Sequence, residues 1–306
     1  MRNRVYPVLL LLLAAIAAPV RSEEAAAVEA TSFGGSPLYR YEVPVERRAA
    51  VYERIAALEA KADKSEDDYE TLGYLYIEVG RFQAAIELYT RGLEAYPASF
   101  RLLRHRGHRY LNTRQLAPAI ADLERAVELI GDAHGDVVQY RLGGDAFGTY
   151  EHWVWYHIGL YHYLQGDHDA AAAAFARCIG TARSDQHRVG AIDWTYNSLI
   201  KAGRAEEARA VLAQAPARAD IPSSYTYWER VRVYRGELDP TTLLDLDKPG
   251  AQWDGREITT GYGVATWYAS NGQTERAQRI FDAILQARAW SSWAYVVTDR
   301  EQSAAR

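Results

Sequence analysis

Apolar and small residues recur with helical spacing along most of the chain, and in one stretch the whole pattern repeats. Between residues 66 and 133, the conspicuous positions of one segment return about 34 positions later. The recurring pairs are Gly73 and Gly107, Tyr76 and Tyr110, Ala85 and Ala119, Tyr89 and Leu123, and Gly92 and Ala126. Small residues at these intervals suit antiparallel helices that pack closely. The pattern therefore predicts two consecutive helical hairpins.

Each recurring residue has a physical role in such a hairpin. Gly73 and Ala85 are small enough for two helices to approach, and Tyr89 fills the space above them. Gly80 tolerates the left-handed conformation of the turn, and Pro97 stops the second helix. Neither helix can bury its apolar stripe alone. We therefore expect the hairpins to stack around a shared core, with a concave groove lined mainly by first helices.

The repeating unit resembles the tetratricopeptide repeat (TPR) family. The first copy carries nearly the whole family pattern, with tyrosine where tryptophan is usual, at Tyr69, Leu72, Gly73, Tyr76, Ala85, Tyr89 and Pro97. The resemblance covers roughly residues 66–289 and implies an all-α solenoid of about five to six helical hairpins. It also implies a binding module, because proteins of this family hold ligands on the groove side of the first helices.

The later hairpins follow the pattern less regularly. The third is marked by Trp155, Ile158, Gly159, Gly166, Ala171 and Phe175, and the fourth by Ile192, Tyr196, Gly203, Ala208 and Leu212. In the fifth, residues 225–234 form a first helix, but two proline-containing turns leave its second helix short. The sixth contains Val264, Ala265, Tyr268, Gly272, Ala277 and Phe281. We expect capping helices over residues 45–61 and 290–304, the second closing the open end of the stack.

The amino-terminal residues predict export. Arg2 and Arg4 precede an apolar run over residues 8–18, and small side chains follow it, as in a secretory signal peptide over residues 1–22. A membrane anchor is the alternative, but the run is too short to span a bilayer comfortably. We therefore expect a periplasmic or secreted protein without a stable membrane anchor after cleavage. Residues 23–44 are predicted to be a flexible tether, and 45–306 to be the repeat domain.

Composition narrows the function classes. The 306 residues are 48% apolar and carry a net charge of −5, which permits a large core and argues against a general nucleic-acid binder. The single cysteine, Cys178, cannot form an internal disulfide and lies among small residues, so we expect it to be buried. We expect no cofactor and no metal, because no motif for either is present.

A long connector interrupts the repeats at residues 131–149. It holds glycines and aspartates in a chain whose other turns are short, and connectors of this length are usually functional or disordered. Asp132, Asp136 and Asp145 do not have the spacing of a calcium loop. The insert is either a surface excursion or a flap over the groove.

Helical spacing selects the residues that should line the groove. They lie on the first helices of the second, third and fourth hairpins. The candidate ligand-binding set is Arg101, Arg104, His105, His108, Trp153, Tyr156, His157, Asp193, Trp194, Asn197 and Lys201. Guanidinium groups bind carboxylates or phosphates, and aromatic faces hold apolar or sugar-like surfaces, so the set predicts an anionic ligand or peptide carboxylate. Alternatively, the arginines are solvated or pair with Glu70, Glu78 or Asp193.

Two classes of function remain open. The first is an exported scaffold that binds a peptide, protein or anionic ligand in its groove. The second is an enzyme that acts on a small anionic or sugar substrate under the 131–149 flap, with His108, His157 and Asp193 as acid–base groups. No known catalytic signature accompanies these residues. A closed pocket that holds all three within hydrogen-bond reach would favour catalysis, and an open trough would favour binding.

Overall fold

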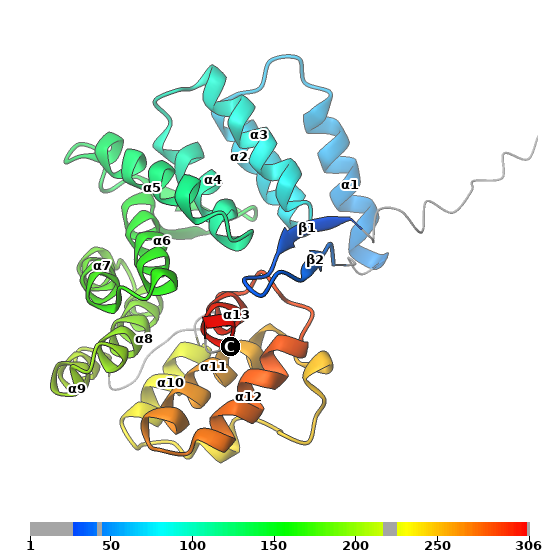
Figure 1. Ribbon diagram of the computed structural model, residues 1–306. Coiled ribbons are helices and arrows are strands. Elements are labelled where there is room, and N and C mark those ends of the chain that lie inside the picture. Colours follow the sequence, from blue (N-terminus) through cyan, green and yellow to red (C-terminus); the bar gives the residue numbers. More distant parts are fainter. Residues whose placement is uncertain (1–26, 42–44, 217–224, 305–306) are drawn as a thin grey trace, which may run out of the picture.

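The computed structural model describes residues 27–41, 45–216 and 225–304. The predicted signal peptide lies outside these residues. The described chain is all-α apart from two short strand pairs, as predicted (Figure 1). The helices are α1 (Val45–Glu59), α2 (Glu66–Glu78), α3 (Phe82–Ala95), α4 (Phe100–Asn112), α5 (Leu116–Ile130), α6 (Tyr150–Gln165), α7 (His168–Thr181), α8 (Asp185–Lys201), α9 (Ala205–Leu212), α10 (Tyr225–Tyr234), α11 (Gly255–Ser270), α12 (Thr274–Gln286) and α13 (Trp293–Ala304). The strands are β1 (Val28–Thr31), β2 (Pro37–Tyr39), β3 (Val138–Tyr140) and β4 (Ala146–Thr149). Within the described ranges, no helix has the length and apolar content needed to cross a bilayer.

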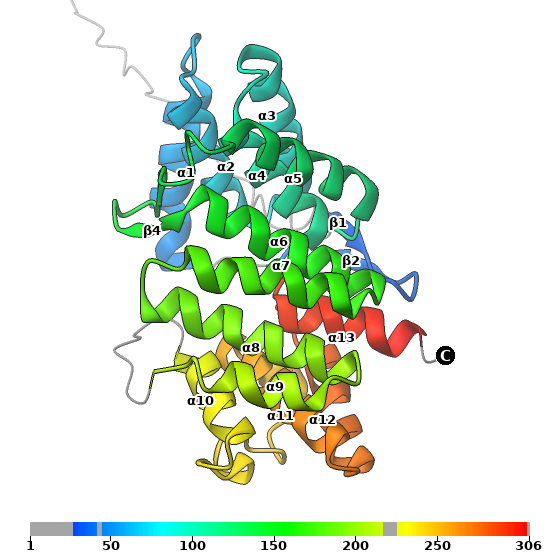
Figure 2. The same ribbon diagram turned by 90° about the vertical axis from the view of Figure 1, so that its left-hand side faces the viewer.

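Helices α2 to α9 form four consecutive antiparallel pairs, and each pair packs on the next (Figure 2). The small residues allow the close approach that the sequence predicts. The ring of Tyr89 lies directly against Gly73, and a Cβ added to Gly159 would lie 2.7 Å from the ring of Phe175. Gly80 has a φ of 72° in the turn after α2, as its role there requires. Cys178 is fully buried among these helices.

The regular pairing stops at α10. This helix packs against α8 and α11, and two short 3₁₀ segments, Pro240–Thr242 and Gly250–Gln252, follow it instead of a second α-helix. The sequence predicts this shortening from its proline-containing turns. Helices α11 and α12 then form a further pair.

The last helix differs in position from the expectation that it closes the open end. Helix α13 packs against α6, α11 and α12 and lies between the two arms of the stack (Figure 1). Just before it, the Trp290 ring lies 4.8 Å from that of Phe82, and its Nε1 donates a hydrogen bond to the Tyr39 carbonyl oxygen at 2.7 Å. Val296 and Val297 are fully buried there. The apolar face of α13 is covered on the inner side of the stack. The sequence of α13 does not specify this position, because it depends on contacts with helices distant in sequence.

Two strands form within the segment that is predicted to be a flexible tether. Strands β1 and β2 pair antiparallel beside α3 and α13. Glu29 is buried between Arg40, at 2.7 Å, and the backbone N–H of Gln83, at 3.0 Å. Asp299 of α13 accepts a hydrogen bond from the backbone N–H of Phe33. These strands are too short for their alternation to be recognised, and contacts distant in sequence hold them.

Candidate functional site

A pocket of about 260 Å³ remains between α13 and the first helices of successive pairs. Its walls come from α4, α6, α8, α10, α13 and the turn and second strand of the β3–β4 hairpin. The lining residues are Arg104, His108, Arg141, Phe147, His152, Trp153, Tyr156, His157, Gln186, His187, Gly190, Tyr227 and Trp293. The lining surface is mainly apolar. The shape of the pocket thus depends on residues that lie almost two hundred positions apart.

Arg104 is the buried cation of this pocket. Its residue is only 2% exposed, and its guanidinium carbon lies 5.9 Å from the centre of the Trp153 ring. One terminal nitrogen donates a hydrogen bond to Nδ1 of His105 at 2.9 Å, while Nε has no partner. Among the described residues, no carboxylate lies within ion-pair distance of Arg104. The pocket therefore contains a buried positive charge without a matching negative charge.

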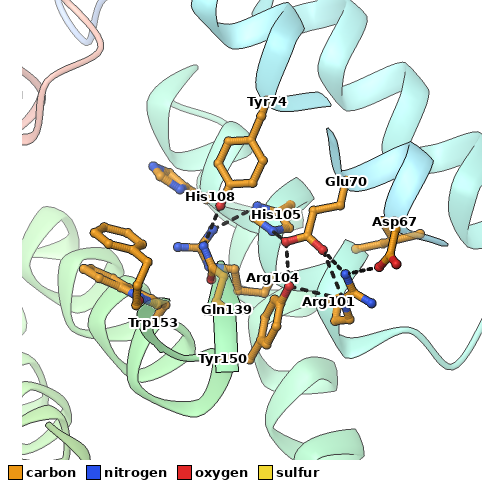
Figure 3. A network of polar contacts seen from close by, with 12 residues as sticks. Asp67, Glu70, Tyr74, Arg101, Arg104, His105, His108, Gln139, Tyr150 and Trp153 are labelled. Atoms are coloured by element: carbon orange, nitrogen blue, oxygen red, sulfur yellow. Dashed lines mark hydrogen bonds and ion pairs between the residues drawn. The ribbon is translucent and has the colours of Figure 1, made fainter. Parts of the chain in front are cut away.

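His105 contacts the guanidinium of Arg104 and connects it to Glu70 (Figure 3). An arginine can only donate, so Nδ1 of His105 accepts and its Nε2–H donates to Oε1 of Glu70 at 2.7 Å. Burial lowers the pKa of His105 to about 4, against the attraction of Glu70. Burial alone would raise the pKa of Glu70, but His105 and Arg101 bring it down to about 2. The chain of contacts is thus an anionic carboxylate, a neutral imidazole and a guanidinium.

Arg101 belongs to the other side of this network. It forms ion pairs with Glu66 at 3.3 Å, with Asp67 at 2.5 Å and with Glu70. Its Nε also donates to the hydroxyl of Tyr150 at 3.1 Å. These groups border a second pocket of about 410 Å³, in which both signs of charge are present. One of the alternatives left open by the sequence, pairing of Arg101 with Glu70, is therefore realised.

Two neutral histidines lie beside Arg104. The rings of His108 and His157 are 4.1 Å apart, and Trp293 of α13 stacks on His108 at 5.1 Å. Burial, and then Arg109, lowers the pKa of His108 well below its usual range; burial and then Arg104 do the same for His157. Nδ1 of His108 accepts a hydrogen bond from Arg109, so the proton of the neutral ring is on Nε2.

Arg109 is a second buried cation of α4. It is 6% exposed, its Nε has no partner, and burial lowers its pKa to about 10. Within the part of the chain that the structure describes, it also has no carboxylate in ion-pair range. Two such arginines raise the electrostatic potential around the histidine pair and favour an anion there.

The 131–149 insert forms one wall of the pocket. Phe147 of β4 stacks on Trp153 with ring centres 4.4 Å apart, and Arg141 lies over the Phe147 ring at 4.1 Å. The indole Nε1 of Trp153 donates a hydrogen bond to the Phe147 carbonyl oxygen. Arg141 and Phe147 were not selected from the sequence, although they stand out among the glycines and aspartates of the insert.

The structure brings five of the predicted site residues together: Arg104, His108, Trp153, Tyr156 and His157 all line the pocket. Arg101 and His105 lie in the adjoining network instead. Trp194 is buried behind the pocket and donates a hydrogen bond from Nε1 to the Tyr156 hydroxyl at 2.7 Å. Lys201 pairs with Glu301 of α13 at 3.0 Å.

Asp193 and Asn197 of α8 do not reach the pocket. Asp193 is fully buried against Arg230 of α10 at 2.7 Å, and burial raises its pKa to about 6. Asn197 donates a hydrogen bond to the Tyr234 hydroxyl at 3.2 Å and accepts one from Thr266 at 2.9 Å. Helices α10 and α11 cover this face of α8, so the predicted trio of His108, His157 and Asp193 is not assembled.

Other lining residues were missed because the sequence does not predict that their helices reach the pocket. Gln186 and His187 begin α8, Tyr227 lies on the unpaired helix α10, and Trp293 begins α13. Trp293 falls within residues 290–304, which the sequence predicts to be a terminal capping helix. In the part of the chain that is described, no group of three histidine, cysteine or carboxylate side chains could hold a metal ion.

Comparison with known families identifies two tetratricopeptide repeat matches, over residues 70–134 and 154–185. The fold and these matches define a helical-repeat scaffold for protein interactions. The chain thus contains tetratricopeptide repeats over these two segments.

Two solved structures are similar, titled "Crystal structure of MamA protein" and "Crystal structure of MamA", each 16% identical with a TM-score of 0.40. The first match covers 71% of this chain and 88% of the other, and the second covers 77% and 98%. A search of curated proteins found no match.

Proposed function

We propose that this scaffold binds its partner through an anionic group that enters the pocket at Arg104. The observation that carries the proposal is a buried guanidinium with no carboxylate in ion-pair range among the described residues. A buried, uncompensated charge is costly, and a bound anion would remove that cost. Neutral histidines and aromatic rings surround the same space, so bulk water screens the attraction only weakly.

The partner is a peptide or protein, possessing a carboxylate, in the periplasm or outside the cell. The repeats support a protein partner, and the leader-like residues 1–22 support export. Catalysis lacks a comparable observation, because Asp193 is paired with Arg230 and lies away from His108 and His157.

Affinity capture with matched variants tests the proposal. The chain from residue 23 onwards, Arg104→Gln and Arg125→Gln serve as baits for periplasmic or secreted extract, and mass spectrometry identifies the captured proteins. Arg125 is an exposed control on α5 whose ion pair, among the described residues, is with Glu128. We expect proteins captured by the unaltered chain and by Arg125→Gln to be lost from Arg104→Gln, while circular dichroism shows the same fold.

Retention of the same proteins by folded Arg104→Gln would contradict the proposal. A double variant, Arg104→Gln with Tyr156→Phe, extends the test to the Tyr156 hydroxyl, which accepts from Trp194, and keeps the aromatic ring that lines the pocket. Its loss of capture should be at least as complete.

A further inference from the structure

We infer that the pocket holds a small planar aromatic carboxylate, or a chain end of that chemistry, rather than an extended peptide. The inference rests on the proposed function, because it specifies the anion that meets Arg104. It follows from three properties of the pocket: its small volume, its aromatic walls and the one buried arginine among its lining residues.

The inner side of the stack is already occupied by the chain itself. Helix α13 lies there, with Trp293 against His108 and His157 and with Arg300 donating from Nε to the Leu164 carbonyl oxygen at 2.9 Å. The Nδ2 of Asn112 donates to the carbonyl oxygen of Ser291 at 2.8 Å, which fixes the segment before α13 to α4. A long peptide cannot run along this surface without removing α13, whose Val296 and Val297 are fully buried. The pocket beside α13 remains accessible on this surface.

The size of the pocket fits one ring and a short acidic group. Its volume of about 260 Å³ exceeds the roughly 150 Å³ of an apolar cavity that holds benzene. It is smaller than the pockets of about 300–1,000 Å³ that hold drug-sized ligands. Phe147, Trp153, Tyr156, Tyr227 and Trp293 supply aromatic surface from four different elements. Aromatic walls on several sides favour a flat apolar body.

The charge of the pocket fits one negative group. Arg104 supplies a planar guanidinium that can bind a carboxylate through two parallel hydrogen bonds. The neighbouring His108 and His157 are neutral, so they do not match a second negative charge. A phosphate would bring up to two charges into a mainly apolar pocket, where Arg104 is buried but the other lining arginine, Arg141, is exposed. A carboxylate is therefore the better match.

Calorimetric titration with 3-phenylpropionate tests this inference. Three comparison compounds separate its parts: the neutral 3-phenylpropionamide, propionate without a ring, and inorganic phosphate. We expect 3-phenylpropionate to bind and each comparison compound to bind at least about tenfold more weakly, the usual effect of losing a charge-assisted hydrogen bond or a buried ring. Equal binding of the acid and its amide, tighter binding of phosphate, or no binding of 3-phenylpropionate would overturn the inference.

Three variants place the ligand. Arg104→Gln should weaken 3-phenylpropionate binding by about tenfold or more, and Phe147→Ala should also weaken it because Phe147 forms a wall. Arg125→Gln should not change it. Unchanged affinity of both Arg104→Gln and Phe147→Ala would place the ligand elsewhere and overturn the assignment.

Peptides distinguish the two sources of this chemistry. A short peptide that ends in phenylalanine with a free carboxylate is compared with the same peptide amidated at its end. Binding of the peptide with a free carboxylate, but not of the amidated peptide, indicates that the ligand is a chain end. Binding of 3-phenylpropionate but of neither peptide indicates a free small molecule. Both results support the inference. If Arg104→Gln loses its captured proteins but no aromatic carboxylate binds, this inference fails while the proposed function stands. If 3-phenylpropionate binds but Arg104→Gln still captures the same proteins, the proposed function fails.

Discussion

Helix α4 carries two kinds of arginine, one paired with carboxylates and one not. Arg101 faces three carboxylates from α2, and Arg106 pairs with Asp122 of α5 through its Nε at 2.7 Å. Arg104 and Arg109 stand three positions further along and contact histidines instead. The paired arginines join neighbouring helices, whereas the buried arginines without carboxylates border the pocket or its histidines. Residue type alone therefore does not distinguish an arginine that joins helices from one that can bind a ligand.

The largest expected effect on stability concerns Glu70, the carboxylate that contacts both Arg101 and His105. Replacement by Gln removes the ion pair to Arg101 and the anionic acceptor of His105, in a residue that is 6% exposed. We expect the free energy of unfolding to fall by about 3 kcal/mol, the cost of breaking a buried pair. Chemical denaturation measures it. Asp67→Asn is the control: this partner of Arg101 is 76% exposed, so its loss should cost less than about 1 kcal/mol. Similar losses for both variants would show that Glu70 has no central role.

Because these histidines are neutral in the folded protein, we expect its stability to fall as the pH is lowered. His105, His108, His152 and His157 have pKa values in the folded protein below the usual value of 6.5. The unfolded chain therefore binds more protons as the pH drops below about 6.5, and each histidine removes up to about 1.4 kcal/mol of stability per pH unit. Asp193, with a pKa raised to about 6, and Asp122, whose pKa burial also raises, act in the opposite direction, but they are two groups against four. Burial also lowers the pKa values of His168 and His187, which adds to the effect of the four.

Urea denaturation at pH 7 and pH 5 measures this dependence. We expect a lower free energy of unfolding at pH 5. His152→Gln keeps a donor for the Cys178 carbonyl oxygen and should reduce the dependence by about one quarter. Equal stability at both values would mean that the histidines are not held neutral.

A smaller effect separates the two kinds of arginine directly. Arg106→Gln should lower the free energy of unfolding by about 1–3 kcal/mol, because it leaves the largely buried Asp122 without its cation. Arg104→Gln should change it by less than about 1 kcal/mol: loss of the hydrogen bond to His105 is offset by removal of an uncompensated charge. Thermal or chemical denaturation of both variants tests this. A greater loss for Arg104→Gln would indicate that Arg104 is a structural residue.

The repeat could be predicted because its information is local. The spacing of Gly73, Tyr89 and their later counterparts fixes which helices pair and how closely, and the structure confirms these contacts. The first helices were therefore found, and with them the pocket residues Arg104 and Tyr156. Pairing of Arg101 rather than Arg104 could not be predicted, since it depends on how α2 is rotated against α4.

The remaining part of the site depends on contacts that are distant in sequence. Trp293 reaches the pocket only because α13 lies inside the stack, and Phe147 only because the insert folds into a hairpin. Asp193 was expected beside the histidines, but α10 covers its face of α8 and supplies Arg230 as its partner. A helical pattern shows which residues share a face, and packing decides what that face meets.

A crystal of the protein soaked with 3-(4-bromophenyl)propionate tests the central claim most directly. The anomalous signal of bromine locates the ring, and the electron density locates the carboxylate. We expect bromine among Phe147, Trp153 and Tyr227, with the carboxylate on the guanidinium of Arg104. A carboxylate at the Arg101 side, or an empty pocket with bromine bound elsewhere, would contradict it.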